Sequence, residues 1–207
     1  MVLTADGSEL LVGEMDGALG LWDVSTGRPV RTFQNDGGVR HLALGPGGEV
    51  FACPGKLKPL DVELRSARSG EVLARLPMPD DQEDGRGWRD GTRFTFTPDG
   101  KWLVVARENG PRLARHPVRV FDVATQRAVR EFGEGGVTAL AVSPDGRAAA
   151  TGGEDGAIGL WDLATGDRRD WFGSGQWTVR GLAFGADGKT LYAGGDDGTI
   201  RGWAVKP

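Results

Sequence analysis

The sequence predicts an all-β fold in which one four-stranded antiparallel unit is repeated along the chain. One reason is the abundance of turn residues, since 35 of the 207 residues are Gly, while no long segment shows the apolar period of a helix. Another is the stretch of residues 137–166, which reads as three strands joined by tight turns. The third is that this stretch recurs along the chain at a regular spacing. A chain of this length can bury a substantial core.

The turns define the reference unit. Residues 143–146, Ser-Pro-Asp-Gly, place Pro second and Gly fourth in a turn, where a fixed φ and a permissive backbone are wanted. Asp155-Gly156 is a pair that two-residue hairpins prefer, because both central residues need positive φ. A further turn at Thr165-Gly166 leads into a short outer strand. The predicted strands are residues 137–143, 148–153, 158–163 and about 168–172.

Five copies of the unit can be located by the glycine of the first turn, at Gly7, Gly48, Gly100, Gly146 and Gly188. A period of roughly 40 to 45 residues is typical of the blades of a β-propeller. A third-strand position, mostly aromatic, follows the same period, at Trp22, Leu64, Phe121, Trp161 and Trp203. We therefore expect a β-propeller of about five four-stranded blades, at residues 1–36, 37–79, 80–133, 134–175 and 176–207.

The motifs on the third strands are Leu21-Trp22-Asp23, Val120-Phe121-Asp122, Leu160-Trp161-Asp162 and the weaker Gly202-Trp203-Ala204. With these motifs the chain resembles the WD40-repeat family over nearly its whole length. The resemblance implies a buried hydrogen-bond network in which the Trp joins a Ser or Thr, a His and an Asp. The residues to which it assigns a structural role are Trp22, Asp23, Thr151, Asp155, Trp161, Asp162 and Trp203.

The His position of that network is empty, and Asn35, Gly133 and Gly175 stand near it. The aspartates of the second hairpins then need backbone donors or water, because an unpaired buried carboxylate is costly. These aspartates are Asp16, Asp155 and Asp197.

The copies differ in their ends and insertions. Copy one begins inside its inner strand at Met1, and copy five stops after its third strand. Copy two has a hairpin at residues 54–59 whose two prolines should keep it short and exposed. Copy three carries an acidic insertion at residues 77–91 and a basic one at 107–117, which the resemblance places on one rim.

These ends predict an incomplete or open ring, and a chain that is the C-terminal part of a longer protein. Apolar faces of the terminal blades would then be exposed and favour self-association. On the inner strands we expect equivalent, buried residues at Leu3, Leu44, Phe96, Val142 and Phe184.

The composition excludes several function classes. A net charge of −4 gives no reason to expect nucleic acid or an anionic membrane as partner. The single Cys53 excludes an internal disulfide framework, and the N-terminus lacks a secretory pattern, which favours a cytoplasmic setting. With only His41 and His116, a zinc site or a catalytic triad has few candidates, and His41 is expected to be a partly buried structural residue.

No cofactor or metal is predicted either. Neither standard phosphate-loop spacing is present. Residues 80–91 resemble the start of a calcium loop, but Gly91 stands where the loop needs Glu, so a solvated acidic loop is the better interpretation.

The predicted function is therefore non-catalytic: a scaffold that binds an acidic or phosphorylated peptide of a protein partner on one rim. The candidate partner-binding residues are Arg40, Trp88, Trp177, Arg180, Arg112 and Arg115. The alternative for such loop residues is packing on their own blade. Two other functions stay open. One is an accessory propeller region of a larger signalling enzyme, such as the protein kinase fusions that the resemblance suggests, and the other is a propeller enzyme with a channel site, which the carboxylate-free inner strands disfavour.

Overall fold

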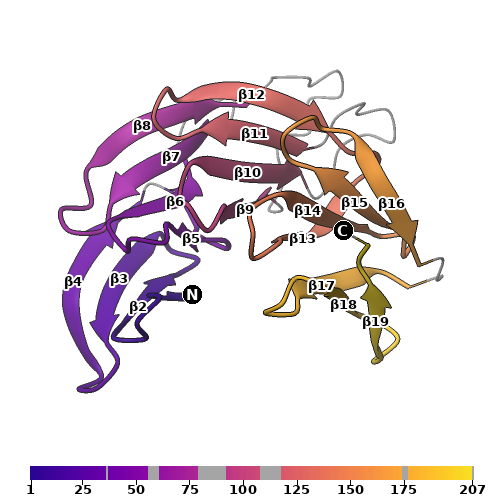
Figure 1. Cartoon of the computed structure of the whole chain (residues 1–207). Helices are drawn as coiled ribbons and strands as arrows, with labels where there is room; N and C mark the ends of the chain where they lie inside the picture. The colour runs from indigo at the N-terminus through magenta and orange to yellow at the C-terminus, as the bar shows by residue number, and fades with distance from the viewer. Residues whose placement is uncertain (36, 56–60, 79–91, 108–117, 174–176, 207) are drawn as a thin grey trace.

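The computed structural model describes the 207-residue chain except residues 36, 56–60, 79–91, 108–117, 174–176 and 207. The described part consists of five antiparallel sheets that follow one another along an arc (Figure 1). Within each sheet the strands pair in chain order. The calcium-like segment, the tip of the copy-two hairpin and most of both insertions lie outside the described residues.

The strands of the five sheets have the following bounds. Sheet 1 contains β1 (Val2–Leu3), β2 (Glu9–Gly13), β3 (Ala18–Asp23) and β4 (Arg28–Gln34). Sheet 2 contains β5 (Ala43–Leu44), β6 (Val50–Pro54), β7 (Asp61–Ser66) and β8 (Val72–Pro77). Sheet 3 contains β9 (Thr92–Phe96), β10 (Trp102–Arg107), β11 (Val118–Asp122) and β12 (Arg127–Phe132). Sheet 4 contains β13 (Val137–Val142), β14 (Ala148–Gly153), β15 (Ile158–Asp162) and β16 (Arg168–Phe172), and sheet 5 contains β17 (Val179–Phe184), β18 (Thr190–Gly195) and β19 (Ile200–Ala204).

The arc is organised around its inner strands. Each of β1, β5, β9 and β13 contacts the inner strand of the next sheet, whereas β4, β8, β12 and β16 form the outside of the arc (Figure 1). Sheets 1 and 5 stand at its two ends, and no strand pairing joins them within the described residues. The predicted all-β propeller of four-stranded sheets with an open ring is confirmed.

The first turns follow the predicted chemistry. Gly146 adopts a φ of 70°, and its N–H bonds the carbonyl of Ser143, so glycine is needed to close the turn. The first-turn glycine of a sheet also packs against the turn proline of the preceding sheet. A Cβ on Gly100 would lie 3.2 Å from Pro46, and one on Gly146 would lie 3.5 Å from Pro98.

The second hairpin differs from its prediction. Only Gly156 has positive φ, at 78°, and Asp155 does not. The N–H of Gly156 bonds the carbonyl of Gly153, so the connection is a type I turn followed by a left-handed glycine rather than a two-residue hairpin. Asp155 then needs no positive φ, which a non-glycine residue adopts only at a cost.

The core consists of apolar layers between neighbouring sheets. Phe94 and Leu103 lie in the layer between sheets 2 and 3, and Val104 and Trp161 lie in the layer between sheets 3 and 4. Corresponding layers join sheets 1 and 2 and sheets 4 and 5. Both faces of an interior sheet are thereby covered, which explains why its strands are apolar throughout.

The five inner-strand residues are at equivalent positions, as predicted, but the prediction that Leu3 is buried is wrong. Each of these five residues pairs with the equivalent residue on the second strand of its own sheet, as Leu3 pairs with Leu10 and Phe96 with Leu103. This position faces the preceding sheet. Phe96 is buried at 9% exposure, the side chains of Leu44, Val142 and Phe184 are partly buried, and that of Leu3 is 50% exposed. Leu3 is exposed because no described sheet precedes sheet 1.

Candidate functional site

The candidate site lies on one rim of the arc. In an antiparallel meander, the second hairpins and the connections between sheets lie at one end of the sheets, which we call the hairpin rim. The first and third turns lie at the other end, which we call the turn rim. Arg40, Trp177 and Arg180 stand on the hairpin rim, where chain from one sheet enters the next.

Arg40 and Arg180 occupy equivalent places. Val39 and Val179, which precede them, are both buried. Each valine packs against a second-strand glycine of the preceding sheet, where a Cβ on Gly13 would lie 2.6 Å from Val39 and one on Gly152 would lie 2.5 Å from Val179. The arginines that follow are exposed on the hairpin rim.

Arg180 is bound within its own sheet. Its Nε and Nη2 donate to the two carboxylate oxygens of Asp196 at 2.7 and 2.8 Å, a bidentate arrangement. The hydrogen bond from Arg180 holds the pKa of Asp196 below its usual value. Both side chains are about half exposed, at 56% and 49%, so water competes with the pair and its stabilising effect is small.

Trp177 packs on the same sheet. A Cβ on Gly195 would fall within the indole ring, 1.8 Å from one ring carbon, so glycine is required beneath it. The guanidinium carbon of Arg201 lies 4.7 Å from the ring centroid, and Arg201 also pairs with Asp197 at 2.7 Å. Trp177 is therefore a half-buried platform whose position is fixed by its own sheet.

Positively charged side chains of sheets 2 and 3 lie near His41. His41 follows Arg40 and is half-buried. Burial lowers the pKa of His41 to about 4, and the charges of Arg93 and Arg40 lower it in the same direction. Burial and these two neighbouring arginines therefore both disfavour a positive charge on His41. The remaining candidates, Trp88, Arg112 and Arg115, lie outside the described residues.

The structural residues of sheet 4 form part of the expected network. The indole N–H of Trp161 donates to Thr151 Oγ1 at 2.8 Å, and both side chains are buried. Phe132 of the preceding sheet stacks on Trp161 with ring centroids 5.3 Å apart. Trp22 and Trp203, at the same position of sheets 1 and 5, are only partly buried.

The aspartates have roles other than a buried network. Asp155 is exposed, and its Oδ1 accepts the N–H of Ala157 at 3.1 Å; Asp16 and Asp197 are exposed and bond the backbone two residues on in the same way. The expectation that backbone donors satisfy these carboxylates is confirmed, but they lie at the surface, where each one closes its own turn, and not in a buried network. Asp23 and Asp162 similarly accept backbone N–H groups of their third turns.

Sheet 2 carries a buried network that the sequence did not reveal. Strand pairing matches Phe51 with Arg65, as it matches Ala149 with Trp161, so Arg65 and not Leu64 occupies the aromatic position. Arg65 bonds Glu63 at 2.8 Å and reaches Asn35 Oδ1 of sheet 1 at 3.2 Å. Asn35, which stands near the expected His position, is thereby bonded to the aromatic position of sheet 2.

Other chemistry finds little support among the described residues. They contain no group of three or more His, Cys, Asp or Glu side chains that could hold a metal ion. Burial raises the pKa of the Cys53 thiol to about 12, so it is not a nucleophile at neutral pH. In the same part of the chain, no helix is long and apolar enough to cross a membrane.

Comparisons with known proteins give one consistent family. The WD40 family model, described as WD domain, G-beta repeat, matches residues 126–162 and 169–204. The small ribosomal subunit protein RACK1y of Oryza sativa subsp. japonica is 28% identical over 169 residues, which are 80% of this chain and 48% of that protein. The guanine nucleotide-binding protein subunit beta of Oryza sativa subsp. indica is 33% identical over 160 residues, which are 72% of this chain and 39% of that protein, and the subsp. japonica protein gives the same values. The chain thus spans less than half the length of these relatives. With its repeated sheets and third-strand motifs, it belongs to the WD40-repeat β-propeller family.

Proposed function

We propose that this chain is a non-catalytic interaction module that binds an acidic or phosphorylated peptide of a protein partner at the inner part of its hairpin rim. The observation that carries the proposal is the equivalent, exposed placement of Arg40 and Arg180 directly after buried valines. Guanidinium groups bind carboxylate and phosphate in a planar, bidentate fashion. The half-buried Trp177 beside Arg180 adds a rigid aromatic surface of the kind that anchors peptides.

The surroundings support an anionic ligand. Arg93 and Arg40 act on His41 from two neighbouring sheets, so positive charge is concentrated at this place. Arg180 can exchange Asp196 for a ligand carboxylate at little cost, since the pair is half exposed. The names of the similar proteins describe subunits of larger assemblies, which agrees with an interaction role.

Peptide binding measured by fluorescence polarisation tests the proposal. The probes are glutamate-rich and phosphoserine peptides, with the glutamine and serine peptides of the same sequence as controls. We expect binding of the anionic probes only, and weakening by salt. Arg40→Ala with Arg180→Ala should lower the affinity at least tenfold, because hydrogen bonds to charged groups contribute about 1.5–3 kcal/mol each.

The matched control is Arg28→Ala with Arg127→Ala, which removes two exposed arginines from the outer strands. This control should leave affinity unchanged. Equal loss in both double variants would show a nonspecific charge effect. Undiminished binding in the Arg40 and Arg180 variant would place the site elsewhere.

Self-association is a second candidate function, favoured by the end faces of the arc. Leu3 and Val24 of sheet 1 are 50% and 49% exposed, and Tyr192 and Ile200 of sheet 5 are 45% and 79% exposed. In the interior of the arc, the corresponding faces pack on each other, as Ile158 of sheet 4 packs on sheet 5. We propose head-to-tail contact between sheet 5 of one copy and sheet 1 of another.

Light scattering across a concentration series tests this contact. We expect the apparent mass to rise with concentration, and Ile200→Lys with Tyr192→Lys to abolish the rise. A constant monomer mass in the unchanged protein would contradict it.

A further inference from the structure

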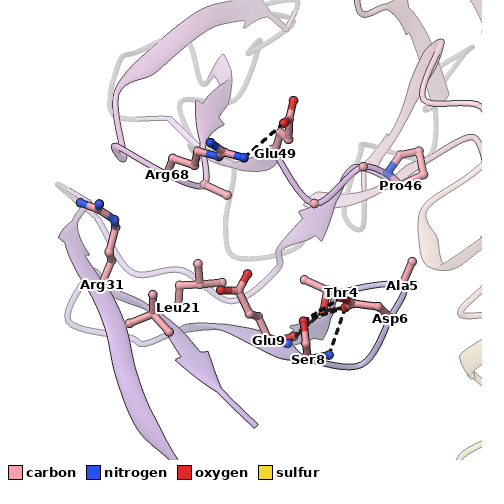
Figure 2. Close-up of a pocket in the computed structure, with 14 residues that line it drawn as sticks. Thr4, Ala5, Asp6, Ser8, Glu9, Leu21, Arg31, Pro46, Glu49 and Arg68 are labelled. Carbon is pink, nitrogen blue, oxygen red and sulfur yellow. Dashed lines mark hydrogen bonds and ion pairs between the residues drawn. The ribbon is translucent and has the colours of Figure 1, made fainter. Parts of the chain in front are cut away.

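A groove of about 570 Å³ opens between sheets 1 and 2 on the turn rim, opposite the candidate site (Figure 2). Its walls are the first turns of both sheets, strand β4 at Val30 and Arg31, and the third turn of sheet 2 at Ala67 and Arg68. The volume lies within the range of roughly 300–1,000 Å³ that is typical of ligand sites.

The groove exists because two positions are smaller here than at other junctions between sheets. Ala5 stands where the first turns of sheets 2, 3 and 4 carry proline, at Pro46, Pro98 and Pro144. Sheet 5 also has alanine there, Ala186, but no described sheet follows it. Ala67 stands where sheet 4 carries the fully buried Leu163. The side-chain volume that fills this place between sheets 3 and 4 is therefore missing between sheets 1 and 2.

Arg31 lacks, among the described residues, the partner that the equivalent arginine of sheet 3 has in sheet 4. Arg130 of sheet 3 donates its Nε–H to the carbonyl of Ala164 in the third turn of sheet 4, at 2.7 Å. Arg31 has the same register in sheet 1, since it pairs with Leu21 as Arg130 pairs with Val120. The guanidinium of Arg31 makes no hydrogen bond or ion pair with the described residues, and it stands at the groove.

The charges in the groove are separated along its length. Figure 2 shows Arg31 and Arg68 at one end and the Thr4–Ser8 turn at the other, with Leu21 and Glu9 between them. Arg68 has only a loose contact of 3.7 Å with Glu49, and both are more than 70% exposed. The Glu9 carboxylate is partly buried and has no cationic partner within the described residues.

Unlike Glu9, Asp6 is hydrogen-bonded within its own turn. Its Oδ1 accepts hydrogen bonds from Thr4 Oγ1 and from the N–H of Ser8, at 2.6 and 3.0 Å. These bonds lower the pKa of Asp6 to about 2 and commit the carboxylate to its own turn. Glu49 stands beside Arg68 at the arginine end of the groove. Away from that end, Glu9 is then the carboxylate that remains available to a ligand.

Strand β4 also offers backbone groups. It is the outermost strand of sheet 1, so the N–H and C=O groups of its outer edge have no partner strand. An extended peptide uses such groups, while its side chains enter neighbouring pockets.

We propose that this groove binds a short extended segment of a partner protein, with an acidic side chain held by Arg31 and Arg68 and a basic side chain held by Glu9. Small apolar residues between the two charges would lie over Leu21, Val30 and Ala67. The site is independent of the hairpin rim, because the two lie at opposite ends of the sheets.

The test uses blocked peptides in which one lysine and one glutamate are separated by alanine and valine spacers of increasing length. Controls carry two lysines, two glutamates or two glutamines at the same places. Fluorescence polarisation should show binding of one spacing of the mixed-charge peptide, with at least tenfold preference over every control. Arg31→Glu should reverse the preference toward the two-lysine peptide, whereas Arg28→Ala on the same strand should change nothing.

Filling the groove gives a second test that does not depend on charge. Ala5→Pro installs the proline that sheets 2, 3 and 4 hold at this position, and Ala67→Leu installs the leucine of sheet 4. The double variant should abolish binding while the circular dichroism melting curve stays that of the parent. If Leu is not tolerated at Ala67, Ala5→Pro alone provides the comparison. The proposal is overturned if binding persists in the filled protein, or if all four charge patterns bind alike.

Discussion

Arg65 and Glu63, two nearly fully buried residues of strand β7, form an ion pair with Nη2 and Oε2 2.7 Å apart. Arg65 also donates to the backbone carbonyl of Gln34 and to Asn35 Oδ1 in sheet 1, at 3.3 and 3.2 Å. In sheet 4 the same position holds Trp161, which stacks on Phe132 of the preceding sheet. Sheet 2 therefore joins its neighbour through a charged network where sheet 4 uses aromatic packing.

Breaking this pair from one side should be costly. Glu63→Leu leaves the Arg65 guanidinium buried with only two neutral acceptors, so we expect a loss of about 3–5 kcal/mol of unfolding free energy. The double variant Glu63→Leu with Arg65→Leu should lose less than the sum of the single variants, because no buried guanidinium is left without its carboxylate. Arg75, which also pairs with Glu63, is half exposed and keeps its contact with Asp61. Urea unfolding measures all three, with Arg68→Ala as a control that breaks the exposed pair with Glu49 at a cost of about 0.5 kcal/mol or less. Additive losses would show that the two charges are not coupled.

Removing the acceptor of the Trp161 hydrogen bond should cause a smaller loss of unfolding free energy. Thr151→Val keeps the shape of the side chain but leaves the buried indole N–H without its acceptor. We expect a loss of about 1–3 kcal/mol in urea unfolding, the cost of an unsatisfied buried donor. Thr32→Val, at an exposed position of β4, is the control and should be nearly neutral. An unchanged midpoint for Thr151→Val would mean that water replaces the hydroxyl.

Local turn chemistry explains how much of this fold could be predicted. Gly146 and its equivalents require positive φ and recur at the repeat period, so both the sheets and their number follow from them. Aligning the repeats places Leu64 at the aromatic position, because copy two has no aromatic residue there, whereas strand pairing places Arg65 at it. A signal is present in the sequence: Glu63 and Arg65, of opposite charge and two residues apart, alternate with Val62 and Leu64 on a strand of an interior blade, which indicates an internal ion pair.

Burial and cavities depend on neighbours rather than on residue type. Leu3 and Phe96 are equivalent in register, but only Phe96 has a preceding sheet to cover it. The small residues Ala5 and Ala67 are visible in the aligned repeats. Only the structure shows that both alanines line the same groove, because this depends on how sheets 1 and 2 pack together.

The contrast between Leu3 and Phe96 leads to a direct test. Phe96→Asp places a charge in the layer between sheets 2 and 3, and we expect a loss of several kcal/mol or failure to fold. Leu3→Asp, at 50% exposure, should cost less than about 1 kcal/mol. Thermal melting of both variants measures the difference. Equal destabilisation would show that sheet 1 is covered in solution on the face that bears Leu3.

His41 makes stability depend on pH. Its pKa of about 4 in the folded protein lies below the ordinary value of 6.5, because burial and then the charges of Arg93 and Arg40 disfavour the imidazolium. The unfolded chain therefore binds the proton first as pH falls, and the unfolding free energy decreases between about pH 6.5 and pH 4. Solvent reaches part of the ring, so we expect about 1–2 kcal/mol over this window rather than the full value of the shift. His41→Gln should remove that share of the slope and leave the acid loss below pH 4, to which carboxylates with lowered pKa such as Asp6 contribute. Urea unfolding of the parent and the variant across the window gives the difference curve. A His41 imidazole that titrates near 6.5 by NMR, with parallel curves for the two proteins, would show that neither burial nor the neighbouring positive charges disfavour its charged form.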